Sequence, residues 1–277
     1  MAGVLMSSAS QTIPAGPPRL RQIKSRPLRN QIDLVRELVS RDLKVRYKRS
    51  ALGFGWSLLN PLIQLVVFGI VFSRLIPVKV PDFSLFLFSG ILIWSWFQGS
   101  LYNATTCIVD NPGLLRQPRF PSAMLPLAAI ATNWLHFVFA LPILLIAALV
   151  AGHSAAGLWT LPVIMFVQFL FTLAVCYVTA SVHVRFRDTQ HILGVLLFVG
   201  FYLVPVFYLT ESVPADLRSW YQMNPLVQIF DAYHAAVLGG TAPNWEALAR
   251  TAVESVALLA ISVLIFIRSS RSFVEEL

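Results

Sequence analysis

The longest uncharged stretch of this chain covers residues 120–184, which contain no Asp, Glu, Lys or Arg over 65 positions. An α-helix needs about 20 consecutive apolar residues to cross a lipid bilayer. Residues 152–157, Gly-His-Ser-Ala-Ala-Gly, are small and polar, and they divide the stretch into two crossings. The whole chain is 57% hydrophobic and 12% charged, with a mean hydropathy of +0.70. We therefore expect an all-α integral membrane protein and exclude a soluble globular one.

Four further apolar windows, the first three of them uncharged, complete a prediction of six membrane-spanning helices. They cover residues 50–73, 83–109, 189–210 and about 245–267. The last window carries Arg250 and Glu254 near its outer end, where the two side chains can pair one helical turn apart. Residues 50–277 are thus expected to form a single six-span domain.

Two N-terminal regions precede the first predicted span. Residues 1–27 are rich in Ser, Ala, Gly and Pro and lack the apolar core of a signal peptide, so we expect a disordered cytoplasmic tail. Residues 28–49 repeat apolar side chains at helical spacing, which predicts an amphipathic helix in the membrane interface.

Lysine and arginine residues fall mainly on one side of this predicted topology. Of the 21 in the chain, 17 lie in segments assigned to the cytoplasm, 11 of them before residue 50, and 4 lie outside. This asymmetry follows the positive-inside rule, so both termini are expected in the cytoplasm. Contact with anionic lipid then explains the net charge of +8, and nucleic acid is not expected as a partner.

A cluster of cations directly before the first span is a candidate binding site. Its members are Arg41, Lys44, Arg46, Lys48 and Arg49. The simpler interpretation is an anchor in the headgroup region. The functional alternative is an entrance that recognises a phosphate group, because arginine can engage phosphate oxygens with two parallel hydrogen bonds. Both roles can hold together.

Two loops carry apolar residues outside the predicted spans. Residues 110–126 are rich in proline but keep Leu114, Leu115 and Phe120, which predicts a short helix with an apolar face toward the cytoplasm. Such a face suits a soluble partner, although an ordinary connecting loop fits equally well. On the outer side, residues 211–245 predict one or two short helices in the outer leaflet, acting either as a lid or as interfacial packing.

Signatures of enzymes and metal sites are absent from the sequence. There is no P-loop, nucleophile elbow, zinc-protease or EF-hand pattern. Cys107 and Cys176 lie in apolar segments without metal-ligand spacing, and Asp110, Asp188 and Glu254 each stand alone. We therefore expect no enzyme activity, metal or cofactor on this chain.

Four segments together resemble the permease family of ABC-2 type polysaccharide exporters. They are RDLKVRYKRSALGFGWSLLNPL at residues 41–62, NPGLLRQPRFPSAMLPL at residues 111–127, RFRDTQHIL at residues 185–193 and NPLVQIFDAYHAAVLGG at residues 224–240. The resemblance covers nearly everything after residue 30. It implies a homodimeric pore in a bacterial inner membrane, served by two cytoplasmic P-loop ATPase subunits that would bind ATP and Mg.

The resemblance also implies roles for particular regions. The loop between the second and third spans would be the coupling element to the ATPase, with Leu114, Leu115, Arg116, Arg119 and Phe120. Residues 211–240 would form gate helices, with Asp216, Trp220, Asn224 and Asp231 as candidate residues. The first and fifth spans would line the pore.

Aromatic residues are frequent in those two spans and suit a sugar polymer. The candidate pore-lining residues are Phe68, Phe72, Phe198, Phe201, Tyr202, Phe207 and Tyr208. Aromatic faces contact sugar rings without many hydrogen bonds, so a polymer can slide past them, while packing against lipid is the simpler explanation for any single ring. Pro61 and Pro205 are expected to interrupt the hydrogen bonding of the two helices.

Export of a lipid-linked, O-antigen-like polysaccharide is the function that the resemblance favours. A permease for teichoic acid or capsule, or for a drug or small lipid, is the alternative, since fold alone cannot identify the cargo. A membrane-bound glycolipid enzyme ranks last because it would need a cluster of carboxylates or histidines at one membrane face.

Overall fold

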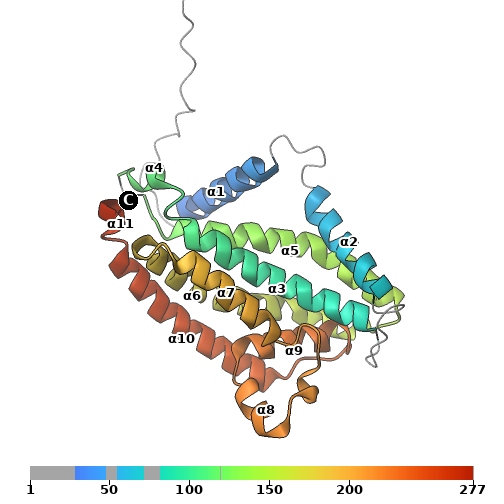
Figure 1. Ribbon diagram of the computed structural model, residues 1–277. Helices are drawn as coiled ribbons and strands as arrows, with labels where there is room; N and C mark the ends of the chain where they lie inside the picture. Colours follow the sequence, from blue (N-terminus) through green and yellow to red (C-terminus); the bar gives the residue numbers. More distant parts are fainter. Residues whose placement is uncertain (1–28, 48–54, 72–81, 119, 277) are drawn as a thin grey trace, which may run out of the picture.

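The computed structural model describes residues 29–47, 55–71, 82–118 and 120–276, and the regular structure in these ranges is helical (Figure 1). The short helices α4 (Pro112–Leu115) and α11 (Phe273–Glu276) lie together at one end of the bundle. Toward the other end lie α8 (Ala215–Tyr221) and α9 (Pro225–Val237). We refer to these as the α4 end and the α9 end. The sequence predicts that the α4 end faces the cytoplasm.

Four helices are long and apolar enough to cross a membrane within the described ranges. They are α3 (Phe83–Thr106), α5 (Met124–Val150), α6 (Leu161–Arg185) with the preceding 3₁₀ turn η3 (Ala155–Thr160), and α10 (Trp245–Ser269). These bounds agree with the second, third, fourth and sixth predicted spans. The break between α5 and η3 falls inside the polar segment that the sequence assigned to it. In α10, Arg250 Nε lies 3.7 Å from Glu254 Oε1, which confirms the expected pairing.

The helices at the first and fifth predicted spans are shorter. Within the described residues, α2 (Trp56–Ile70) has 15 residues and α7 (Thr189–Tyr202) has 14, so these segments rise about 21–23 Å, less than a hydrocarbon core of about 30 Å. The prediction that the fifth helix continues to residue 210 is wrong. The chain bends after Tyr202, because Pro205 has no N–H to donate and disfavours helical geometry in the residue before it.

The bundle is organised around α3, most of which is buried inside the protein. It packs against α5 and α6 and touches α2, α7 and α9, and its side chains Phe88, Ile93 and Trp96 are almost fully buried. The Gln168 side chain in α6 donates a hydrogen bond of 3.1 Å to the Ile93 carbonyl oxygen. α3 is therefore the scaffold that fixes the shorter helices.

The N-terminal helix α1 (Arg29–Tyr47) packs against α5 and crosses it at an angle (Figure 1). Its residues Leu34, Leu38 and Val39 are buried, while Gln31, Asp33 and Glu37 are exposed. This is the amphipathic helix that the apolar spacing predicted. Tyr47 ends the described part of the helix, so the predicted Lys48 and Arg49 lie outside the described residues.

At the α9 end, close backbone contact holds α9 against η3. A Cβ atom at Gly157 would lie 2.6 Å from the Ala236 carbonyl oxygen and 2.7 Å from that of Thr241, so only glycine fits there. His153 Nδ1 lies 2.8 Å from the Leu238 carbonyl oxygen, a geometry in which the ring N–H donates. Val227, Ile229 and Phe230 of α9 are fully buried. One face of α9 is therefore packed into the protein.

Candidate functional site

Aromatic rings form a continuous cluster where α7 ends. Tyr202 contacts Phe198, Phe201 and Phe207, with ring centroids 5.4, 5.5 and 5.7 Å apart. Tyr208 stacks edge-on with Phe207 at 5.2 Å, and its hydroxyl donates to the Tyr202 carbonyl oxygen at 3.1 Å. Five of the seven candidate pore residues are thus neighbours. We call Phe198, Phe201, Tyr202, Phe207 and Tyr208 the aromatic cluster.

The aromatic cluster is anchored on one side and open on the other. Phe201 packs on Trp94 of α3 with centroids 5.8 Å apart, and a Cβ atom at Gly90 would lie 2.9 Å from the Val206 carbonyl oxygen. Phe198 and Tyr202 are 66% and 52% exposed. The cluster therefore presents ring faces on a support that the central helix holds in place.

Phe68, the described aromatic candidate of the first span, is not among the ring contacts of this cluster. Phe68 is half-buried in α2, and its carbonyl oxygen accepts a hydrogen bond of 3.4 Å from Ser84. α2 packs on α3 and α5, whereas α7 packs on α3 and α6. Phe72 lies outside the described residues.

Hydrogen bonds to backbone carbonyls stabilise the predicted gate segment. Arg218 in α8 donates to the carbonyl oxygens of Glu211 and Val213 at 2.6 and 3.0 Å. Arg250 in α10 and Gln228 in α9 both donate to the Gln222 carbonyl oxygen at 2.8 Å. Arg250 thus ties the turn between α8 and α9 to the span α10, and the other three bonds are internal to the gate segment.

The four predicted gate residues have different environments. Asp216 is exposed and Trp220 is 76% exposed, so both are free to contact lipid or cargo. Asn224 caps α9, because its side-chain oxygen accepts from the Leu226 N–H at 3.0 Å. Asp231 accepts a hydrogen bond of 2.7 Å from the Thr210 hydroxyl in η4 (Thr210–Ser212). Two of the four therefore have evident structural roles.

Asp231 lies in α9, outside the four candidate spans, and is only partly exposed. Burial raises the pKa of its carboxyl group to about 6; the Thr210 hydroxyl opposes this shift and the charge of Glu211 adds to it. The folded protein therefore binds this proton more tightly than the unfolded chain does. Stability contributed by the group is greatest at low pH and is lost as the pH rises from about 4 to about 6.

We expect Asp231→Asn to raise the unfolding temperature at pH 8 more than at pH 5. Asparagine keeps an acceptor for Thr210 and removes the charge that burial disfavours. Thermal unfolding in detergent at both pH values measures the difference. The exposed Asp216→Asn serves as control and should show no such pH dependence. If Asp231→Asn changed the unfolding temperature equally at pH 5 and pH 8, the raised pKa of Asp231 would be contradicted.

The described cations of the predicted entrance lie on the last turns of α1. Arg41 donates to Asp42 Oδ1 from Nε and Nη2 at 3.1 and 2.9 Å, so a neighbouring charge already compensates it. Lys44 and Arg46 are exposed. Arg46 Nη1 lies 3.4 Å from His136 Nδ1 of α5, and since arginine has no acceptor, the imidazole nitrogen accepts.

The predicted coupling loop contains α4, a single helical turn. Leu114, Leu115 and Phe120 are half-buried and pack against the core. The helix α4 also contacts the C-terminal helix α11. Pro112, Arg116 and Gln117 form the exposed side of the loop, and Arg119 lies outside the described residues. An incoming partner would thus meet a polar surface backed by apolar packing.

Sequence reasoning missed the residues that hold these surfaces. Trp94 supports Phe201, and Tyr221 donates to the Tyr208 hydroxyl at 3.0 Å, joining α8 to the aromatic cluster. His153 connects the α5–η3 turn to the end of α9. Its position in a Gly-rich turn between two spans was the available signal, but its partner is 85 residues away.

These candidate surfaces lie at both ends of a helical bundle with spans long enough to cross a membrane. The description "ABC-2 type transporter" belongs to the family model that matches residues 33–238, and the chain is therefore a member of that family. This confirms the resemblance drawn from the sequence. Within residues 29–47, 55–71, 82–118 and 120–276, no group of three or more His, Cys, Asp or Glu side chains is placed to hold a metal.

Several characterised proteins are similar to this chain over most of its length. The O-antigen export system permease protein RfbA of Myxococcus xanthus is 35% identical over 247 residues, which are 88% of this chain and 95% of that protein. RfbA of Klebsiella pneumoniae is 28% identical over 88% of this chain and 95% of its own length. The polysialic acid transport protein KpsM of Escherichia coli is 22% identical over 74% of this chain and 81% of its own length.

Proposed function

We propose that this chain is the transmembrane subunit of an ATP-driven exporter that moves a lipid-linked, O-antigen-like polysaccharide across the bacterial inner membrane. One observation carries the proposal: relatives named as O-antigen export permeases align with 88% of this chain and 95% of their own length. A likeness of that extent includes the predicted gate segment, the aromatic cluster and the coupling loop.

The proposed working unit is a homodimer with two cytoplasmic P-loop ATPase subunits. Family membership supports the ATPase, because the chain itself carries no P-loop pattern. Six crossings per copy are proposed, with α2 and α7 as the first and fifth. Exposed apolar residues support a second copy beside α7, where Ile192, Val195 and Leu196 are each more than half exposed.

The proposed path runs between the two copies, along α2 of one and α7 of the other. The aromatic cluster offers ring faces to successive sugars, so a sugar that leaves one ring meets the next. On the last turns of α1, Arg46 and Lys44 would meet the phosphate of the lipid carrier. At the α9 end, exposed Trp220 lies where the polymer would leave.

Loss of the chain should abolish surface polysaccharide while the cell still makes the polymer. We expect a deletion strain to accumulate lipid-linked polymer on the cytoplasmic face and to lose it from the surface. Gel analysis of surface polysaccharide, with and without an intact copy supplied in trans, measures this. Normal surface polymer in the deletion strain would contradict the proposal.

Capsular polysaccharide is the second candidate cargo. KpsM and the capsule polysaccharide export protein CtrC of Neisseria meningitidis match this chain at 22–23% identity. The same deletion strain separates the two, because a capsule polymer would be missing while the polymer attached to lipopolysaccharide would remain at the surface.

The exposed side of the α4 loop should couple ATP hydrolysis to transport. We expect Arg116→Glu to reduce export at least about tenfold, because charge reversal at a contact with a partner typically costs more than about 1.4 kcal/mol. Export and ATP turnover of the reconstituted complex are the measurements. Arg268→Glu changes an exposed cation at the end of α10 and is the matched control. Unchanged export by Arg116→Glu would remove this role.

A further inference from the structure

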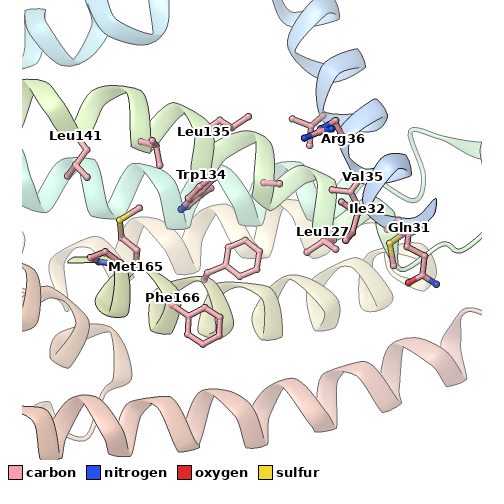
Figure 2. A pocket seen from close by; sticks show the side chains of 16 residues that line it. Gln31, Ile32, Val35, Arg36, Leu127, Trp134, Leu135, Leu141, Met165 and Phe166 are labelled. Carbon is pink, nitrogen blue, oxygen red and sulfur yellow. The ribbon is translucent and has the colours of Figure 1, made fainter. Parts of the chain in front are cut away.

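A long apolar groove lies between α1, α5 and α6, away from the candidate path along α2 and α7 (Figure 2). Its volume is about 980 Å³. On α5 the lining extends from Met124 to Leu141, about 26 Å at 1.5 Å per residue, which exceeds the depth of one leaflet of a bilayer. The groove is therefore long enough to receive a whole acyl chain.

Polar groups in the groove gather at one end. Sixteen side chains line it, and apart from the Trp134 indole only Gln31 and Arg36 carry polar groups. Both belong to α1 and lie at its end of the groove, whereas Leu141 and Met165 lie at the opposite end (Figure 2). One cationic end and a long apolar remainder match an anionic amphiphile, with its headgroup at α1.

Arg36 is exposed at the end of the groove, and two acidic residues are near it along α1. Asp33 and Glu37 are the nearest acidic residues along α1, and all three side chains are exposed. Within the described ranges, none of the ion pairs includes Arg36. Arginine engages phosphate oxygens in a fork that lysine lacks, so a phosphodiester fits this position.

The apolar lining of the groove is partly exposed, and membrane lipid is the molecule that suits it. Ile32 and Phe166 are 68% and 61% exposed although both line the groove. A soluble ATPase cannot reach the depth of Phe166, which lies in the half of α6 nearer the α9 end. Lipid can, because the groove opens along two candidate spans.

We propose that the groove binds one anionic membrane phospholipid, with its phosphate at Arg36 and an acyl chain between α5 and α6. The lipid would brace α1 against the spans, since α1 touches the bundle mainly through α5. This role is separate from cargo transport, and its test does not depend on which polymer is exported.

Mass spectrometry of lipids retained by the purified full-length chain tests the proposal. The protein is incubated with vesicles of phosphatidylglycerol and phosphatidylethanolamine and passed through detergent exchange. We expect about one phosphatidylglycerol per chain. Arg36→Gln should lower its retention about tenfold, as for loss of a charge-assisted hydrogen bond, and should lower retention of phosphatidylethanolamine less, because the ammonium group of that lipid already neutralises its phosphate. Ala131→Trp, which fills the groove, should lower retention of both lipids.

Two controls separate the groove from lipid bound elsewhere on the surface. Arg268→Gln removes an exposed cation, and Leu264→Trp adds the same bulk on the exposed face of α10. Both should retain lipid at the wild-type level. Equal retention by all variants would overturn the proposal. Disulfide cross-linking of two copies through Ala131→Cys would overturn it as well, because a second chain would then cover the groove.

Discussion

Gly157→Val is expected to unfold the α9 end of the protein. Valine would drive its Cβ into two backbone carbonyl groups, those of Ala236 and Thr241, and backbone cannot move aside as a flexible side chain can. We expect a loss of about 3 kcal/mol in the free energy of unfolding, with export falling to background. Thermal unfolding in detergent and the amount of surface polysaccharide measure the two effects.

Gly113→Ala is the matched control for this variant. A Cβ atom at Gly113 in α4 would meet nothing within 4 Å, so the unfolding temperature should not change. A Gly157→Val protein as stable as wild type would show that α9 is not seated on η3 in the membrane.

Replacing Phe198 and Tyr202 together by alanine should slow export of long polymers about tenfold. Each ring would supply roughly 1 kcal/mol of interaction with a passing sugar, and both are largely exposed, so the fold should tolerate the change. Pulse-labelled polymer appearing at the cell surface, sorted by chain length, gives the rate. Short polymers should be affected less, because they need fewer ring faces in series.

Leu196→Ala controls for a loss of apolar area on the same helix, since Leu196 is exposed but carries no ring. A disulfide between Val66→Cys of one copy and Val195→Cys of the other tests whether α2 faces α7 across the dimer. If the double alanine variant exported at the wild-type rate, or if the disulfide between the two copies did not form, the path would not run along α2 and α7. The native cysteines, Cys107 and Cys176, are buried and should not interfere.

The positions of the long helices could be predicted because charge marks the limits of a membrane span. The uncharged run from residue 120 to 184 and its polar break located α5, η3 and α6 to within a few residues. The length of α7 could not be predicted in the same way. The apolar sequence continues through residue 209, but the backbone turns at Pro205. The bend is held in place where the backbone of Val206 lies close to Gly90 of α3.

The sequence identified candidate residues by their type, but it did not show which residues they would contact. Aromatic content identified Phe198, Tyr202 and Phe207, which the structure brings together. Nothing in the sequence indicated that Trp94 supports them or that Leu115 turns toward the core. Those facts depend on which helices become neighbours, and pairings of helices distant in sequence are not encoded in local periodicity.

The C-terminal helix α11 touches both α4 and α6, and Arg185 Nη2 lies 3.4 Å from Glu276 Oε1. A tag or fluorescent protein joined directly to this end would therefore press on the loop proposed to receive the motor. The same proximity makes a small spectroscopic label useful. Placed at Ser272, it would sit close enough to α4 to follow that loop through a cycle of nucleotide binding and release.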